Sequence, residues 1–127
     1  MSGQRTSFRI LVVDDVPDIL NPLKRGLELR NFKVDAFTDP LKALSAFEAG
    51  KYDLALLDVN MPNMNGFQLF HELTKKDPAL KVCFLTAYEH FENGFRNEFP
   101  EISIDCLLRK PMSIAEIAVQ IRKLLSR

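Results

Sequence analysis

Near the N-terminus the chain reads Phe8-Arg9-Ile10-Leu11-Val12-Val13-Asp14-Asp15, in which a run of apolar residues is followed by two acids. A strand that is apolar on both faces is typical of the interior of a parallel sheet, where helices cover it from above and below. Pro17 follows the acids and suits the first turn of an α-helix, because its missing N–H would have no partner there. The segment therefore predicts a buried strand that leads directly into a helix.

The same alternation of short apolar runs and helical patterns continues along the chain, with five of each. Alternating strands and helices are typical of an α/β, doubly wound fold, in which a parallel sheet lies between two layers of helices. The expected strands are Phe8–Val13, Lys33–Phe37, Asp53–Asp58, Lys81–Leu85 and Ile104–Leu108.

Three of the expected helices carry informative details. Pro22 removes a backbone donor from the first helix, which predicts a kink unless the helix begins later. Ser113 and Glu116 have the spacing of a capping box at the start of the last helix. The second helix is expected to begin at Pro40, to end at Gly50 and to bury one apolar stripe. That stripe consists of Leu41, Leu44 and Phe47.

The chain has 127 residues, of which 46% are hydrophobic, and its 17 basic residues balance 17 acidic ones. This size and composition fit one domain over residues 1–127, with Met1 to Ser7 expected as a flexible N-terminal tail. A net charge of +0 without any basic run disfavours nucleic-acid binding. The apolar runs are far shorter than a membrane span and no signal-like segment begins the chain, so a cytoplasmic protein is expected.

Cysteine and histidine offer no metal-binding pattern. Cys83 and Cys106 lack the paired spacing that a zinc site needs. We favour reduced thiols in the core over a disulfide or redox pair, because buried cysteine behaves as a small hydrophobe. His71 and His90 are expected at the surface, since neither has the neighbours typical of a metal ligand or a catalytic base.

Four of the expected strands end in polar residues that can carry chemistry. Asp14 and Asp15 follow the first strand, Asp58 ends the third, Thr86 follows the fourth and Lys110 follows the fifth. Ligands of doubly wound sheets bind at the carboxyl ends of the strands, so these side chains are expected to converge. Close carboxylates repel one another unless a cation lies among them, and their oxygens favour Mg²⁺, with Mn²⁺ as an alternative.

A cation beside Lys110 and Thr86 would suit a phosphoryl group, because ammonium and hydroxyl groups both donate hydrogen bonds to its oxygens. One of the carboxylates would then serve as the nucleophile toward phosphorus, since aspartyl phosphate is an established type of covalent intermediate. The sequence thus predicts a phosphate site with an acidic nucleophile.

These residues resemble the motifs of the response-regulator receiver domain, the CheY-like family of two-component phosphorelay signalling. The resemblance spans nearly the whole chain and implies a flavodoxin-like, five-stranded parallel sheet of strand order 2-1-3-4-5 with five helices. The matching motifs are Asp14-Asp15, Leu56-Leu57-Asp58-Val59-Asn60-Met61-Pro62-Asn63-Met64-Asn65-Gly66, Thr86-Ala87 and Lys110-Pro111.

The resemblance implies a role for each acidic residue. Asp58 would be the phospho-acceptor. Asp14 and Asp15 would position Mg²⁺ together with Asp58 and the backbone carbonyl of Asn60. The same family pattern implies that Asn60 also influences how easily water attacks the phosphate.

The remaining motifs would contact the phosphate. Thr86 would supply the switch hydroxyl, with Ala87 beside it in the phosphate-binding segment, and Lys110 would pair with the phosphate. The peptide bond between Lys110 and Pro111 would be cis, which X-Pro bonds accommodate most readily.

The implied function is that of a signalling switch rather than an enzyme acting on a separate substrate. A histidine kinase or histidine phosphotransfer protein would donate the phosphoryl group. A downstream effector would then recognise the face formed by the fourth helix, the fifth strand and the fifth helix. A monomer or weak dimer is expected, while the pathway, the effector and any further domain stay open.

Leu107 departs from the family pattern, because receiver domains usually carry Tyr or Phe three residues before the lysine. The departure leaves open a second function, a pseudo-receiver that serves as an interaction module with atypical or no switching. An enzyme or a flavin carrier on the same fold is disfavoured. Asn60 stands where a hydrolytic phosphatase would want a second acid, and acids follow the first strand where a flavin would need a Ser/Thr/Gly-rich loop.

Tyr88 occupies a position that flanks the phosphorylated aspartate in the family. We hypothesise that its ring crowds the water that attacks the phosphate. Tyr88→Ala is then expected to speed spontaneous loss of phosphate, which can be followed by the decay of the phosphorylated mass over time. An unchanged decay rate would reject the hypothesis.

Overall fold

The computed structural model describes residues 7–86 and 106–126. Five strands form one sheet in these residues, and every neighbouring pair is parallel. The strand order is β2-β1-β3-β4-β5, which confirms the doubly wound arrangement. The strands are β1 (Arg9–Val13), β2 (Lys33–Phe37), β3 (Leu54–Leu57), β4 (Lys81–Thr86) and β5 (Cys106–Arg109).

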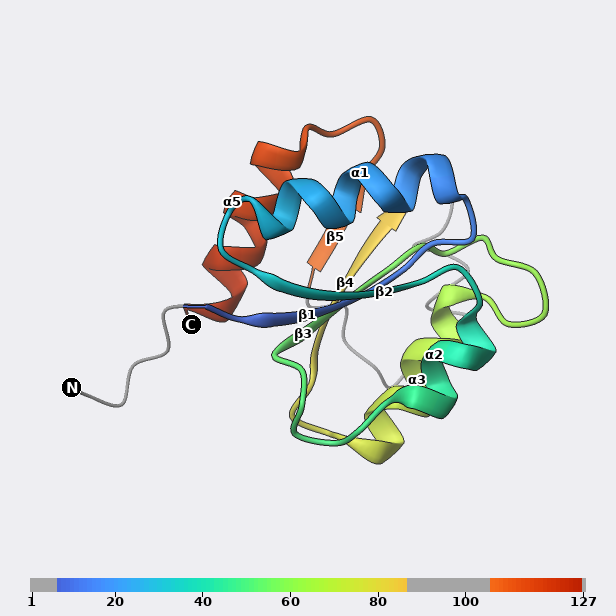
Figure 1. The fold of residues 1–127 in the computed structure, drawn as a ribbon. Helices are drawn as coiled ribbons and strands as arrows, with labels where there is room; N and C mark the ends of the chain where they lie inside the picture. The colour runs from blue at the N-terminus through green and yellow to red at the C-terminus, as the bar shows by residue number, and fades with distance from the viewer. Residues whose placement is uncertain (1–6, 87–105, 127) are drawn as a thin grey trace.

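Helices cover both faces of the sheet, with α1 and α5 on one face and α2 and α3 on the other (Figure 1). The described helices are α1 (Pro17–Glu28), α2 (Pro40–Ala46), α3 (Gly66–Lys76) and α5 (Ile114–Leu125). The fold prediction includes five helices, and the one expected between β4 and β5 falls in residues 87–105, outside the described residues. Residues 1–6 of the expected tail also lie outside them.

The sheet divides the hydrophobic core into two clusters. Ile10 and Val12 of β1 pack toward α1 and α5, whereas Leu11 and Val13 pack toward α2 and α3. All four side chains are almost completely buried. The prediction of an interior strand that is covered on both faces is therefore confirmed.

Two helices differ in detail from their sequence predictions. Helix α1 begins at its expected proline and continues through Pro22, so the alternative of a later start is wrong. Helix α2 ends before Gly50, and Leu41 is 46% exposed rather than buried. The helix ends early because Phe47 adopts an extended conformation and stacks on Tyr52, with ring centroids 5.7 Å apart.

The capping box of α5 is present as predicted. The Ser113 hydroxyl accepts a hydrogen bond from the Glu116 backbone N–H at 3.1 Å, and the Glu116 carboxylate accepts one from the Ser113 N–H at 3.2 Å. Ser113→Ala is expected to lower the free energy of unfolding by about 1 kcal/mol, because a donor at the helix start loses its partner. Urea unfolding measures this change. Ser45→Ala, at an exposed position inside α2, should cost nothing, and equal losses would contradict the capping effect.

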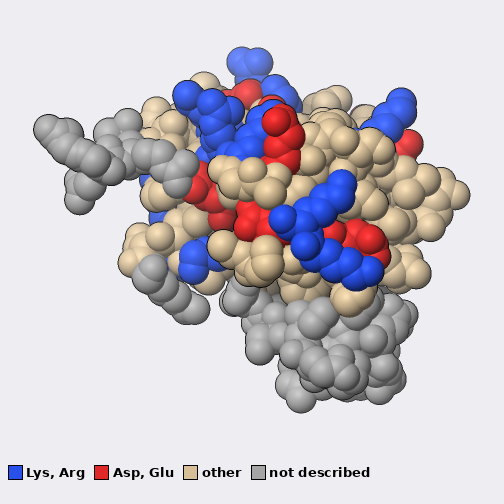
Figure 2. Space-filling model, turned by 90° about the horizontal axis from the view of Figure 1, so that it is seen from below, with Lys and Arg blue, Asp and Glu red and all other residues tan. Residues whose placement is uncertain are grey.

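Charges of both signs are intermingled on the face of the molecule shown in Figure 2. Ion pairs form elsewhere along the described residues as well as in the site; for example, the Lys51 ammonium lies 3.6 Å from a carboxylate oxygen of Asp35 and 3.5 Å from one of Glu48. In residues 7–86 and 106–126, no helix has the combination of length and apolar character that crossing a bilayer requires.

Candidate functional site

An acidic cluster forms where β1 and β3 end. One carboxylate oxygen from each of Asp14, Asp15 and Asp58 lies within 4.8 Å of the others. The cluster follows from strand register, because Val13 of β1 is paired with Leu57 of β3 and the next residue of each strand is an aspartate. A hydrogen bond of 2.9 Å from the Asp58 N–H to the Val13 carbonyl holds the two strand ends together.

Lys110 points into this cluster from the end of β5. Its ammonium lies 3.1 Å from Asp14 Oδ2 and 3.5 Å from Asp58 Oδ1. The backbone N–H of Lys110 donates to the Thr86 carbonyl at 3.0 Å, and the peptide bond between Lys110 and Pro111 is cis. Residues from three separate strand ends thus meet in one place.

The Asp14 carboxylate uses both oxygens within the protein. Oδ1 accepts a hydrogen bond from the Val16 N–H at 3.0 Å, and Oδ2 accepts one from Lys110. Asp14 is only 2% exposed, so these contacts replace the water that it loses on folding. Its side chain is held in one orientation at the edge of the cluster.

The pKa of Asp58 is raised to about 6. Burial is the largest cause, because removal of water disfavours the charged carboxylate. The neighbouring carboxylates of Asp14 and Asp15 raise the pKa further, whereas the Lys110 ammonium lowers it. The site therefore holds more negative charge than one ammonium neutralises, and an added cation would stabilise it.

Three other residues of the expected site, Thr86, Asn60 and Leu107, lie within the described residues. Thr86 is the last residue of β4 and is 1% exposed. Asn60 lies in the loop after Asp58 and is exposed. Leu107 is paired with Phe84 across β4 and β5 and is half-buried against the core cluster on the α3 face. The expected contributions of Ala87 and Tyr88 concern residues 87–88, which lie outside the described residues.

Gly66 has a structural role that the sequence interpretation missed. It is the first residue of α3, and its N–H donates to the Val59 carbonyl at 2.8 Å. A Cβ atom at this position would lie 2.3 Å from the backbone oxygen of Asp58. Glycine is thus required for α3 to approach the strand end that carries Asp58. The available signal was its place at the end of the loop that follows Asp58.

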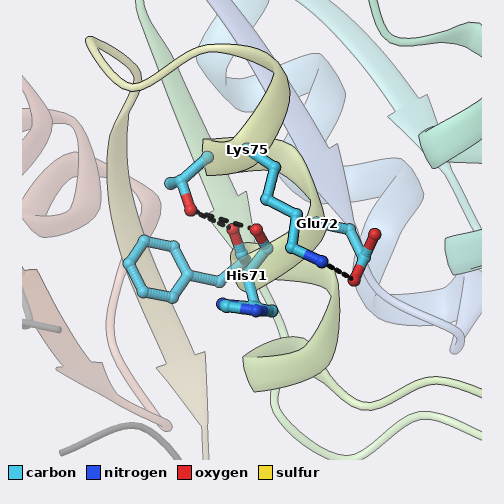
Figure 3. Close-up of polar contacts among 5 residues, drawn as sticks. His71, Glu72 and Lys75 are labelled. Carbon is cyan, nitrogen blue, oxygen red and sulfur yellow. Dashed lines mark hydrogen bonds and ion pairs between the residues drawn. The ribbon is translucent and has the colours of Figure 1, made fainter. Parts of the chain in front are cut away.

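Among residues 7–86 and 106–126, no histidine belongs to the acidic cluster. His71 lies on α3, where its backbone carbonyl accepts a hydrogen bond from the Thr74 hydroxyl at 3.1 Å (Figure 3). Its neighbours on the helix surface, Glu72 and Lys75, form an ion pair with each other at 3.3 Å. His90 lies outside the described residues. The described site is consequently an oxygen-donor site, which suits a hard cation such as Mg²⁺.

A family model for the response regulator receiver domain matches residues 10–122. The chain belongs to this family. The receiver domain is similar to the transcriptional regulatory protein PrrA of Mycobacterium tuberculosis, with 36% identity over 122 residues that cover 96% of this chain and 52% of that protein. This chain therefore spans about half the length of PrrA.

Solved structures of receiver domains share the fold. A CheY-like receiver domain protein from Methanospirillum hungatei is 29% identical, with a TM-score of 0.84 and 95% coverage of both chains. The Thermotoga maritima response regulator TrrA, solved in complex with Mg²⁺-BeF, is 34% identical with a TM-score of 0.79, covering 92% of this chain and 98% of that chain. Receiver domains of response regulators are signalling switches rather than classical enzymes.

Proposed function

We propose that this receiver domain accepts a phosphoryl group on Asp58 from a histidine kinase or a histidine phosphotransfer protein, in a reaction that depends on Mg²⁺. The observation that carries the proposal is the convergence of the Asp14, Asp15 and Asp58 carboxylates with the Lys110 ammonium at one sheet edge. The alternative of unrelated polar strand ends would not require the lysine to contact two of the acids.

The donor set fits a small divalent cation. Carboxylate oxygens are ligands that Mg²⁺ prefers, and one from each of the three aspartates lies within 4.8 Å of the others. Asp14, Asp15 and Asp58 would hold the ion, together with the Asn60 carbonyl, and Mn²⁺ would bind the same oxygens. TrrA, crystallised with Mg²⁺-BeF, supports this assignment by similarity. When bound, the ion would neutralise charge on the transferring phosphoryl group.

The residues of the chain divide the chemistry among them. A carboxylate oxygen of Asp58 attacks phosphorus, so an acyl phosphate bond forms while the bond from phosphorus to the donor nitrogen breaks. The Lys110 ammonium exchanges its carboxylate partners for phosphate oxygens, which it reaches from its present position 3.5 Å from Asp58. The Thr86 hydroxyl donates to another phosphate oxygen. Because Thr86 is the last residue of β4, this hydrogen bond connects the phosphoryl group to that strand.

Incubation with Mg²⁺ and acetyl phosphate tests this proposal. Intact mass spectrometry is expected to show one added phosphoryl group, and beryllofluoride with Mg²⁺ is expected to shift the amide resonances of Asp58, Thr86 and Lys110. No adduct under conditions that label a known receiver domain would overturn the proposal.

Leu107 favours one second candidate, a pseudo-receiver that binds partners without switching. This aliphatic side chain already packs against the core cluster beside β4, where the family usually places a movable aromatic ring. A pseudo-receiver would bind beryllofluoride weakly or leave the resonances of β4 and β5 unmoved. The spectra above therefore distinguish the two functions.

The apparent affinity for Mg²⁺ is expected to fall as the pH is lowered. Below its pKa of about 6, Asp58 carries a proton that must leave before the ion binds. The dissociation constant should rise by up to about tenfold for each pH unit below that value. Calorimetric titrations above and below the pKa measure this slope. Asp58→Asn should show a weaker slope, and a flat profile in the wild type would contradict the role of Asp58.

The partner surface and the cellular location belong to the same proposal. A downstream effector would bind the face that includes β5 and α5, where Val119 is 50% exposed. A cytoplasmic location and a monomeric or weakly dimeric state would suit a switch of this kind. The similarity to PrrA supports a role in transcriptional regulation when further domains are present.

A further inference from the structure

The two cysteines of the chain lie directly opposite each other in the sheet. Cys83 of β4 is the register partner of Cys106 of β5. Both side chains belong to the core cluster on the α1 and α5 face, so they project from the same side of the sheet. The structure has no disulfide between them, as the sequence predicts. We propose that this reduced pair nevertheless closes to a disulfide on exposure to a peroxide. This goes beyond the proposed phosphoryl transfer and does not depend on it.

The sheet geometry permits the bond. Neighbouring strands are about 4.8 Å apart, which lies within the range of about 4.4 to 6.8 Å between the Cα atoms of disulfide-bonded cysteines. Strand β5 ends the strand order and pairs only with β4 among the described strands. Because such an edge strand is held by β4 on one side, it can adjust its distance from β4 when the bond forms.

The two thiols differ in exposure, and this difference assigns their roles. Cys83 is 0% exposed, whereas Cys106 is half-buried and partly accessible to solvent. A peroxide such as hydrogen peroxide would therefore react first with Cys106, adding one oxygen to its sulfur and leaving water. The Cys83 sulfur would then attack the Cys106 sulfenic acid, so that the S–S bond forms and a second water leaves. The peroxide is reduced and the dithiol is oxidised.

The location gives the bond a structural consequence. Strand β4 ends at Thr86, and β5 leads into Lys110, whose backbone N–H donates to the Thr86 carbonyl. A covalent link between Cys83 and Cys106 would restrain the two strands that present these residues. Oxidation would therefore join the edge strand β5 covalently to its inner neighbour β4.

Treatment of the full chain with hydrogen peroxide, followed by alkylation under denaturing conditions, tests the proposal. The expected product has lost the mass of two hydrogen atoms, resists alkylation at both cysteines and recovers both thiols after reduction with dithiothreitol. Peptide mapping should find Cys83 joined to Cys106. No phosphoryl donor is present, so the result is independent of the proposed function.

A variant that keeps the buried thiol provides the control. Cys106→Ser changes a half-buried residue of the edge strand, and circular dichroism checks its fold. In this variant Cys83 should still react fully with the alkylating agent after the same peroxide treatment. The proposal is overturned if the wild type shows no loss of mass, acquires oxygen on Cys106 without a cross-link, or forms covalent dimers through Cys106.

Discussion

Asp58→Asn is expected to abolish the phosphoryl adduct formed with Mg²⁺ and acetyl phosphate. The amide retains the shape of the side chain but lacks the anionic oxygen that attacks phosphorus. It also removes one of the three carboxylates of the acidic cluster, so binding of the divalent cation should weaken. Intact mass spectrometry measures the loss of the adduct directly.

The same substitution is expected to stabilise the folded chain at neutral pH. The pKa of Asp58 is raised from 3.8 to about 6, so the unfolded chain loses this proton at lower pH than the folded one does. The folded state therefore incurs a penalty that develops between these pH values and persists above them. This free-energy penalty is at most about 3 kcal/mol. Urea unfolding without divalent cations should show the gain at neutral pH and little gain below the lower pKa.

Asp18→Asn is a suitable control for both effects. It removes the same charge from an exposed position in the first turn of α1. This variant should keep the phosphoryl adduct and should show no comparable gain in stability. An adduct that persists in Asp58→Asn would assign the acceptor to another residue, and unchanged stability would contradict the electrostatic strain at Asp58.

Gly66→Ala is expected to damage the fold and the site together. The added Cβ would lie 2.3 Å from the Asp58 backbone oxygen and 3.0 Å from the Val59 Cα, so the backbone must move. Overpacking of this kind typically costs about 1 to 3 kcal/mol of stability. Because the atoms that move belong to Asp58, phosphorylation by acetyl phosphate should also slow, by about tenfold or more. Urea unfolding and the rate of adduct formation measure the two effects.

Gly26→Ala provides a matched comparison at the contact between α1 and α5. Its Cβ would lie 2.6 Å from Ile114 Cγ2 and 2.7 Å from Cδ1, which are ends of a side chain that can rotate away. A smaller loss of stability and a normal rate of phosphorylation are expected. If both variants phosphorylate at the wild-type rate, Gly66 does not position Asp58.

The candidate site was largely predictable because its residues occupy the ends of apolar strands. Asp14 and Asp58 each follow a run whose burial is evident from composition, and parallel strands bring their carboxyl ends to one edge. The extent of α2 was less predictable. Leu41 has helical spacing and apolar character, yet it is exposed, because the neighbouring elements leave that side of the helix uncovered.

The contacts across the sheet could not be predicted from the sequence, for a different reason. Nothing in the spacing of Cys83 and Cys106 reveals that they are register partners, since register depends on how β4 and β5 align. The close approach of Gly66 to the Asp58 carbonyl likewise depends on how α3 docks against the end of β3.

Local pattern alone thus determined the order in which the described strands and helices follow along the chain and the interior position of β1. It also determined which acids and which lysine stand at the strand ends. These properties follow from side-chain polarity and spacing along a short stretch of chain. Only the tertiary structure decided the distances among the Asp14, Asp58 and Lys110 side chains, the raised pKa of Asp58 and the pairing of the two cysteines. Each of these depends on burial and on contacts between residues far apart in sequence, which no local pattern encodes.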